Sequence, residues 1–154
     1  MTYPRGVYIV GNGGVVISTA ITIIQIAAGA ANPIEILRAT VTQRGSTTSA
    51  QPDVQLVRKT AAATVTPATP LLLRGSAPAS AAVGGTALTG ITATAEGTDG
   101  DVLPHQGFNV LTGWVYLPIP EERIWVPGGG IIALKFPTAP ATQTWLAEIV
   151  FQEF

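Results

Sequence analysis

Residues able to do chemistry are scarce in this chain and stand far apart. It has no cysteine, a single histidine (His105), and only 11% charged residues, less than half the share of about 25% found in ordinary globular domains. Enzymes usually gather His, Cys, Asp, Glu or Lys side chains with shifted pKa values in one site. The composition therefore predicts a protein that is not an enzyme and that needs no cofactor and no metal.

Three carboxylates, those of Glu96, Asp99 and Asp101, fall close together with glycines between them. Clustered oxygen ligands on a flexible turn can bind Ca²⁺, but the spacing of an EF-hand loop is not met. Asp-Gly pairs are also typical of plain turns between strands. We favour the turn, and we expect a loop over residues 97–106.

The histidine and the adjacent glutamates have equally plain interpretations. No Gly-x-Ser-x-Gly motif supplies a nucleophile for His105, so a local hydrogen bond is favoured over a catalytic triad. Glu121 and Glu122 are neighbours, and neighbours in an extended chain point to opposite faces, so they would not flank one substrate. A turn is expected here, with Arg123 paired to a nearby acid.

Gly11, Gly13 and Gly14 resemble half of a phosphate-binding loop, but no Gly-Lys-Ser/Thr and no helical pattern follow them. The pair Asn12-Gly13 is typical of tight hairpin turns, because both residues tolerate positive φ. We therefore expect a hairpin between the strands on either side.

Large aromatic residues concentrate in the second half of the chain. Trp114 and Tyr116 would share one face of a strand. Packing in the core is the default for such a pair, and a protein interface or a platform for sugar binding are the alternatives.

Short runs of β-branched and apolar residues, separated by Gly and Pro, position these groups. The expected strands are Gly6–Val10, Val15–Ala27, Pro33–Gln43, Asp53–Thr60, Leu88–Glu96, Phe108–Leu111, Trp114–Leu117, Ile124–Val126, Gly130–Phe136 and Thr144–Gln152. About 8–10 short strands with turn signals between them predict an all-β, antiparallel sandwich or barrel with no substantial helix.

Alternation along the expected strands assigns their faces. In the last strand, one face collects four apolar residues: Trp145, Ala147, Ile149 and Phe151. In Pro33–Gln43, the same period of two places Leu37, Ala39 and Val41 on one face. Residues 131–136 are apolar on both faces apart from Lys135, which is typical of a central strand.

The whole chain, residues 1–154, is expected to form one domain with an N-terminal arm over residues 1–5. Residues 61–87 are rich in Ala, Pro, Thr, Ser and Gly and predict a long surface loop with at most a short strand near Leu71–Leu73. Residues 14–31 carry no charge, but β-branched residues dominate them, so a strand is favoured over a membrane span.

The charge balance argues against nucleic acid and for self-association. The formal net charge is −1, the mean hydropathy is +0.40, and the lysines and arginines are scattered rather than gathered on one segment. Low net charge promotes association. We therefore expect much of the surface to be covered by protein partners.

Several runs of the sequence resemble a family of small virion proteins of tailed bacteriophages. The resemblance covers most of residues 34–154. It is carried by Glu35-Ile-Leu-Arg-Ala-Thr-Val, Gln55-Leu-Val-Arg-Lys-Thr, Gly107-Phe-Asn-Val-Leu-Thr-Gly-Trp, Leu117-Pro-Ile-Pro-Glu-Glu-Arg and Gly130-Ile-Ile-Ala-Leu-Lys-Phe. The run Pro118 to Arg123 is the most specific part.

The resemblance implies a capsid decoration, or cement, protein with a jelly-roll-like sandwich. Such a protein would be made in the host cytoplasm, bind the major capsid protein on the outer capsid surface, and form a homotrimer. The alternatives are a carbohydrate-binding head-fibre or host-attachment module, and a tail or connector protein. The candidate interface residues are Tyr3, Arg5, Arg74, Trp114, Tyr116 and Arg123.

Overall fold

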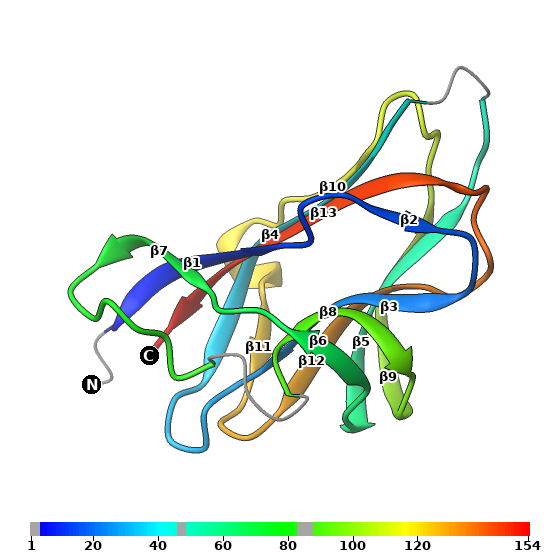
Figure 1. Cartoon of the computed structure of the whole chain (residues 1–154). Coiled ribbons are helices and arrows are strands. Elements are labelled where there is room, and N and C mark those ends of the chain that lie inside the picture. The colour runs from blue at the N-terminus through cyan, green and yellow to red at the C-terminus, as the bar shows by residue number, and fades with distance from the viewer. Residues whose placement is uncertain (1–3, 46–48, 83–87) are drawn as a thin grey trace.

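The chain folds into two antiparallel β-sheets packed face to face (Figure 1). The computed structural model describes residues 4–45, 49–82 and 88–154. The first sheet contains β1 (Gly6–Gly11), β2 (Val15–Ile17), β4 (Ile34–Arg44), β7 (Leu71–Gly75), β10 (Trp114–Tyr116), β11 (Ile124–Val126) and β13 (Gln143–Glu153). The second sheet contains β3 (Ile21–Ala27), β5 (Asp53–Ala61), β6 (Thr64–Pro67), β8 (Gly90–Ala95), β9 (Thr98–Gly107) and β12 (Ile131–Phe136). The helical content of the described residues is one short 3₁₀ turn, η1 (Pro120–Glu122).

The strand orders are those of a jelly roll. The first sheet runs β10–β4–β13–β1–β7, with β11 also on β4 and β2 also on β13, and the second runs β6–β8–β3–β12–β5–β9. Because β1 and β2 pair with successive parts of β13, they act as one interrupted strand, and β10 and β11 do the same along β4. With β6 to β8 set aside as an insertion, the eight remaining strands form the two four-stranded sheets of a jelly roll. The expected β-sandwich is confirmed.

Large side chains from the two inner faces interdigitate to make the core. Trp145 lies edge-on to Phe136, with ring centroids 4.9 Å apart, and Tyr8 stacks on Phe151 at 5.7 Å. The expected inner face of β13 is confirmed, because all four of its apolar residues are buried. The central place of residues 131–136 is also confirmed, since β12 lies between β3 and β5.

Several expected strand boundaries are wrong. The expected strand Val15–Ala27 is two strands, because the chain crosses between the sheets at residues 18–20. Residues 97–106, expected as a loop, lie almost entirely in β9, an edge strand that pairs with β5. Phe108–Leu111 is not a strand, and residues 110–112 form a turn. The described residues form thirteen strands rather than 8–10, partly because residues 61–82 of the expected long loop contain β6 as well as β7, while residues 83–87 of that loop lie outside the described residues.

The face assigned to Leu37 is wrong for a physical reason. A β-bulge in β4 shifts its register against β13 between Phe151 and Val150. One extra residue moves the alternation by one position. Ile36 and Ala39 therefore both point into the core, and Leu37 does not join it.

Candidate functional site: two edges of the first sheet

The carboxylates that could have formed a cation site are bound by lysines instead. Asp99 receives Lys59 Nζ at 2.7 Å on one oxygen and Lys135 Nζ at 2.6 Å on the other. Glu96 accepts hydrogen bonds from the backbone N–H and the hydroxyl of Thr22, at 2.6 and 2.7 Å. These groups join β3, β5, β9 and β12 on the second sheet. We call Lys59, Glu96, Asp99 and Lys135 the ion network.

The pKa directions in the ion network match this pairing. Burial acts to raise the pKa of Glu96, but the Thr22 hydrogen bonds and the ammonium groups of Lys135 and Lys59 outweigh it and lower that pKa. Burial opposes ionisation of Asp99 too, and hydrogen bonds from Lys135 and Lys59 bring its pKa below the ordinary value. Two cations thus hold two anions charged, which is a structural arrangement rather than a poised acid or base.

The remaining acid and histidine do not complete a site. Asp101 is exposed and takes no part in the ion network, and in the described part of the chain no three acidic or histidine residues gather in a way that could hold a metal ion. His105 Nε2 lies 3.6 Å from Asp53, and both side chains are about half exposed. Along β5, His105 is opposite Gln55 and Asp99 is opposite Lys59. His105 and Asp99 therefore lie at different levels of β9.

The glycine-rich segment after β1 is not the expected hairpin, because β1 and β2 do not pair with each other. Both pair with β13 instead, and the buried side chain of Asn12 bridges the interruption. Asn12 Nδ2 donates to the Trp145 carbonyl at 3.0 Å, and its Oδ1 accepts from the N–H groups of Ala147 and Gly14 at 3.0 and 3.1 Å. In the gap between β1 and β2, the side-chain amide of Asn12 therefore makes the hydrogen bonds to β13 that a strand backbone would otherwise make.

The N-terminal arm is tied to the end of the chain. Arg5 Nε donates to the fully buried Glu153 carboxylate at 2.7 Å. The other oxygen of Glu153 accepts from Ser80 Oγ at 2.7 Å and from the N–H of Ala81 at 2.8 Å. Arg5 thus helps to hold residues 79–82 in place, because it shares the Glu153 carboxylate with residues 80–82 and donates to the Ala79 carbonyl at 3.4 Å. It also remains a candidate contact residue. Tyr3 lies outside the described residues.

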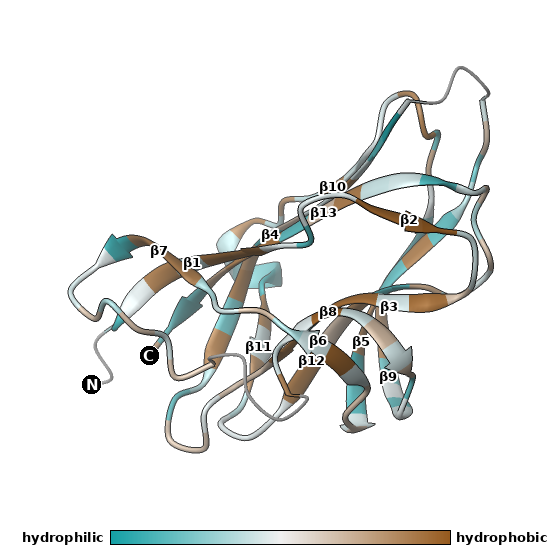
Figure 2. Cartoon of the chain, viewed as in Figure 1, coloured by the Kyte–Doolittle hydropathy of each residue, from teal (hydrophilic) through white to brown (hydrophobic). Residues whose placement is uncertain are grey.

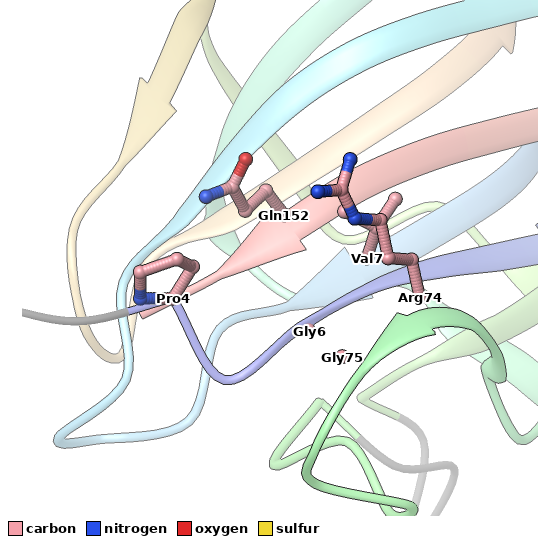
Figure 3. A pocket seen from close by; sticks show the side chains of 6 residues that line it. All are labelled: Pro4, Gly6, Val7, Arg74, Gly75 and Gln152. Carbon is pink, nitrogen blue, oxygen red and sulfur yellow. The ribbon is translucent and has the colours of Figure 1, made fainter.

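One edge of the first sheet is formed by β7, which is exposed along its whole length. Its three consecutive leucines, Leu71, Leu72 and Leu73, are the brown stretch of this strand in Figure 2. Arg74 follows them and lines a shallow pocket of about 240 Å³ with Val7 and Gln152. Figure 3 shows the Arg74 and Gln152 side chains on the same side of the sheet.

The opposite edge is formed by β10 and β11, and it places the other candidate residues differently. Trp114 is buried at 4% exposure, its Nε1 donates to Gln106 at 2.8 Å, and its ring stacks on half-buried Tyr116. Trp114 therefore belongs to the core, as the default interpretation expected, and is not an exposed contact residue. Arg123 pairs with Glu35 at 3.3 Å, which agrees with the expected turn and ion pair.

Apolar side chains that the sequence interpretation did not single out are exposed on this second edge. Leu117 is 71% exposed, Ile119 59% and Trp125 44%. The Trp125 ring is tilted against that of Phe154, with centroids 5.2 Å apart. In the chain between Ile119 and Trp125, η1 carries the exposed Glu121 and Glu122. Surface patches of this kind are typical of protein interaction sites.

Comparisons with protein-family models, with curated proteins and with solved structures found no match for this chain. Within the described ranges, no helix is both long and apolar enough to cross a membrane.

Proposed function

We propose that the protein is a structural component of a virion, a decoration protein that binds the outside of a phage capsid as a homotrimer and stabilises the shell. The observation that carries the proposal is the pair of exposed apolar edges on one sheet of a jelly roll. A clamp between shell subunits needs a rigid body and surfaces that partners can cover. It needs no chemistry.

The pairing of charged side chains within the chain supports the same function. Two of the three candidate acids, Glu96 and Asp99, are paired with lysines in the ion network, and the Glu153 carboxylate binds Arg5 of the N-terminal arm. Enzyme sites instead keep such groups accessible and near the pH at which they act. The jelly roll is also a recurrent fold of viral capsid and lectin domains.

A sugar-binding role is less well supported. It would depend on an exposed aromatic platform around Trp114 and Tyr116, but Trp114 is buried and hydrogen-bonded to Gln106. A tail or connector role uses the same fold and the same edges, so the experiment must separate it from a head role.

The test uses particles of the phage that encodes the chain, with its gene deleted. Purified protein is added to these particles, and binding is followed by co-sedimentation and electron cryomicroscopy. We expect saturable density at repeated sites on the outer shell and a higher temperature of capsid opening. Density confined to the tail or neck, or no binding to particles at all, would overturn the proposal.

A further inference from the structure

The two edges of the first sheet carry complementary side chains. The basic edge is formed by Leu71, Leu73 and Arg74 of β7. The acidic edge is formed by Leu117, Ile119, Glu121, Glu122 and Trp125, between β10 and the middle of β11. Each edge therefore combines exposed apolar side chains with unpaired charged side chains of one sign. The arginines beside the acidic edge are both bound within the chain, Arg123 to Glu35 and Arg58 to the Trp125 carbonyl.

The charged groups of both edges lack partners inside the described part of the chain. Arg74 makes no side-chain hydrogen bond or ion pair there, and neither do Glu121 and Glu122. By contrast, the neighbouring Arg5 and Arg123 are each paired, with Glu153 and Glu35. An unpaired cation on one edge and two unpaired anions on the other are what a contact between opposite edges would match.

The register of the sheet places Arg74 of the basic edge and Trp125 of the acidic edge at the same level. Cross-strand partners lead in one row from Arg74 through Val7, Gln152 and Glu35 to Trp125. Directly paired residues point to the same face of a sheet. A second copy displaced across the strands therefore brings Arg74 to the face and the level of Trp125. A shift of a few residues along the strands, toward η1 between β11 and β10, brings Arg74 to Glu121 and Glu122.

Backbone pairing between such copies is hindered on the acidic edge. Pro118 and Pro120 lack an N–H, and η1 interrupts the line of β10 and β11 along β4. Proline and interruption are common ways of blocking an edge against strand addition. The contact would therefore be made by side chains, which is where the apolar and charged complementarity lies.

We propose that a second copy of this chain docks its basic edge on the acidic edge of the first, head to tail. Every copy then offers one edge of each kind, and the contact repeats from copy to copy. Closure of the repeat into a ring of three rests on the proposed function, whereas the edge-to-edge contact does not.

The experiment measures self-association of the full chain by sedimentation velocity and by light scattering after size exclusion, with no capsid present. The wild type is expected to reach three times the mass of one chain. Arg74→Glu alone, and Glu121→Lys with Glu122→Lys, should each raise the dissociation constant at least tenfold by placing like charges together. The triple variant, with all three substitutions, restores opposite charges and should return to within threefold of the wild type.

Matched controls are available on the same molecule. Arg44→Glu makes the same charge change at the far end of β4, and Asp101→Lys reverses an exposed acid on the second sheet. Both should leave association unchanged. Leu71→Ser with Leu73→Ser tests the apolar part and should weaken association without altering the circular dichroism spectrum.

Three results would overturn the inference. These are a wild-type chain that stays monomeric at 100 μM, a triple variant no better than the single-edge variants, and a closed assembly of two copies. Because no capsid takes part, a failure here leaves the capsid-binding test of the proposed function standing, and a failure of that test leaves this contact standing.

Discussion

At the scale of single residues, buried polar side chains complete the backbone where strands are interrupted or end. Asn12 replaces backbone partners for β13, and Glu153 collects the donors of residues 80–82. A buried donor or acceptor that loses its partner costs about 1–3 kcal/mol. These few residues therefore weigh more in the stability than their number suggests.

Asn12→Ala should lower the free energy of unfolding by about 2–4 kcal/mol, because it leaves the Trp145 carbonyl and the Ala147 N–H buried without partners. Urea unfolding followed by tryptophan fluorescence measures the loss. Asn32→Ala is the control, since Asn32 makes a single partly buried bond to the Phe154 carbonyl, and it should cost about 1 kcal/mol. Equal losses in the two variants would contradict the role given to Asn12.

Glu153→Gln should destabilise the protein by about 2–4 kcal/mol, because it removes the buried charge that Arg5 and Ser80 satisfy. Amide hydrogen exchange should also rise at Ala81 and Ala82, whose N–H groups donate to this carboxylate.

Glu148→Gln is a matched control for Glu153→Gln on the same strand. Its ion pair with Arg38 spans 3.7 Å, and both side chains are about half exposed, so the change should stay within about 0.5 kcal/mol. An effect of Glu148→Gln as large as that of Glu153→Gln would show that burial of the charge is not the cause.

The sequence could not reveal these residue roles. Ser80 lies 73 positions from Glu153, and Asn12 lies 133 from Trp145. Nothing local distinguishes such a Glu or Asn from a solvated one. The Arg123 pair was predictable only as a type, because the partner acid, Glu35, lies on β4.

At the scale of elements, predictability follows burial. Strands with an inner face, such as β4 and β13, show the period of two and were found nearly whole. The edge strand β9 has no buried residue, so no apolar alternation marks it, and its Gly, Asp and Pro residues are typical of a loop. The leucines of β7 were visible in the sequence, but their exposure was not.

The ion network makes the stability of the second sheet depend on pH. The folded-state pKa values of Glu96 and Asp99 lie below their ordinary values of 4.5 and 3.8. Their contribution to stability is therefore full above those ordinary values and is lost as the pH falls through the lower folded-state values. Lys135 has a raised pKa, so its contribution is full below its ordinary value of 10.5 and is lost as the pH rises through the folded-state value.

Urea midpoints measured from pH 7 down to pH 2.5 should fall steadily at the acid end. Asp99→Asn should flatten this fall, because it removes one of the two carboxylates that the lysines hold. Asp101→Asn should leave the curve unchanged, since Asp101 is exposed and outside the ion network. A curve that Asp99→Asn does not change would rule out the ion network as its source.

At the scale of the whole molecule, no strand pairs with the strand next to it in the sequence among the described residues. The first strand pairs with the last, and β4 pairs with β13, β10 and β11. The composition and turn spacing were enough to predict a sandwich, but they do not specify such long-range partners. The jelly-roll order follows from the pairing, which only the structure supplies.

This topology predicts slow folding. A long stretch of chain must be closed before each strand finds its partner, so the entropic cost comes before the contacts that repay it. Sandwiches dominated by distant pairings fold in about milliseconds to seconds, and the absence of any hairpin between consecutive strands in the described ranges places this protein at the slow end. Refolding from urea, followed by the fluorescence of the tryptophans, of which Trp114 and Trp145 are buried, should therefore show a main phase of about 0.1 s or longer. The rate should not change with protein concentration below the level at which copies associate.

The control is brief unfolding before refolding, which removes phases caused by proline isomerisation in the unfolded chain. The slow main phase should still be present after brief unfolding. A main phase faster than a millisecond would contradict the prediction, because it would mean that the distant strand pairings do not limit the rate.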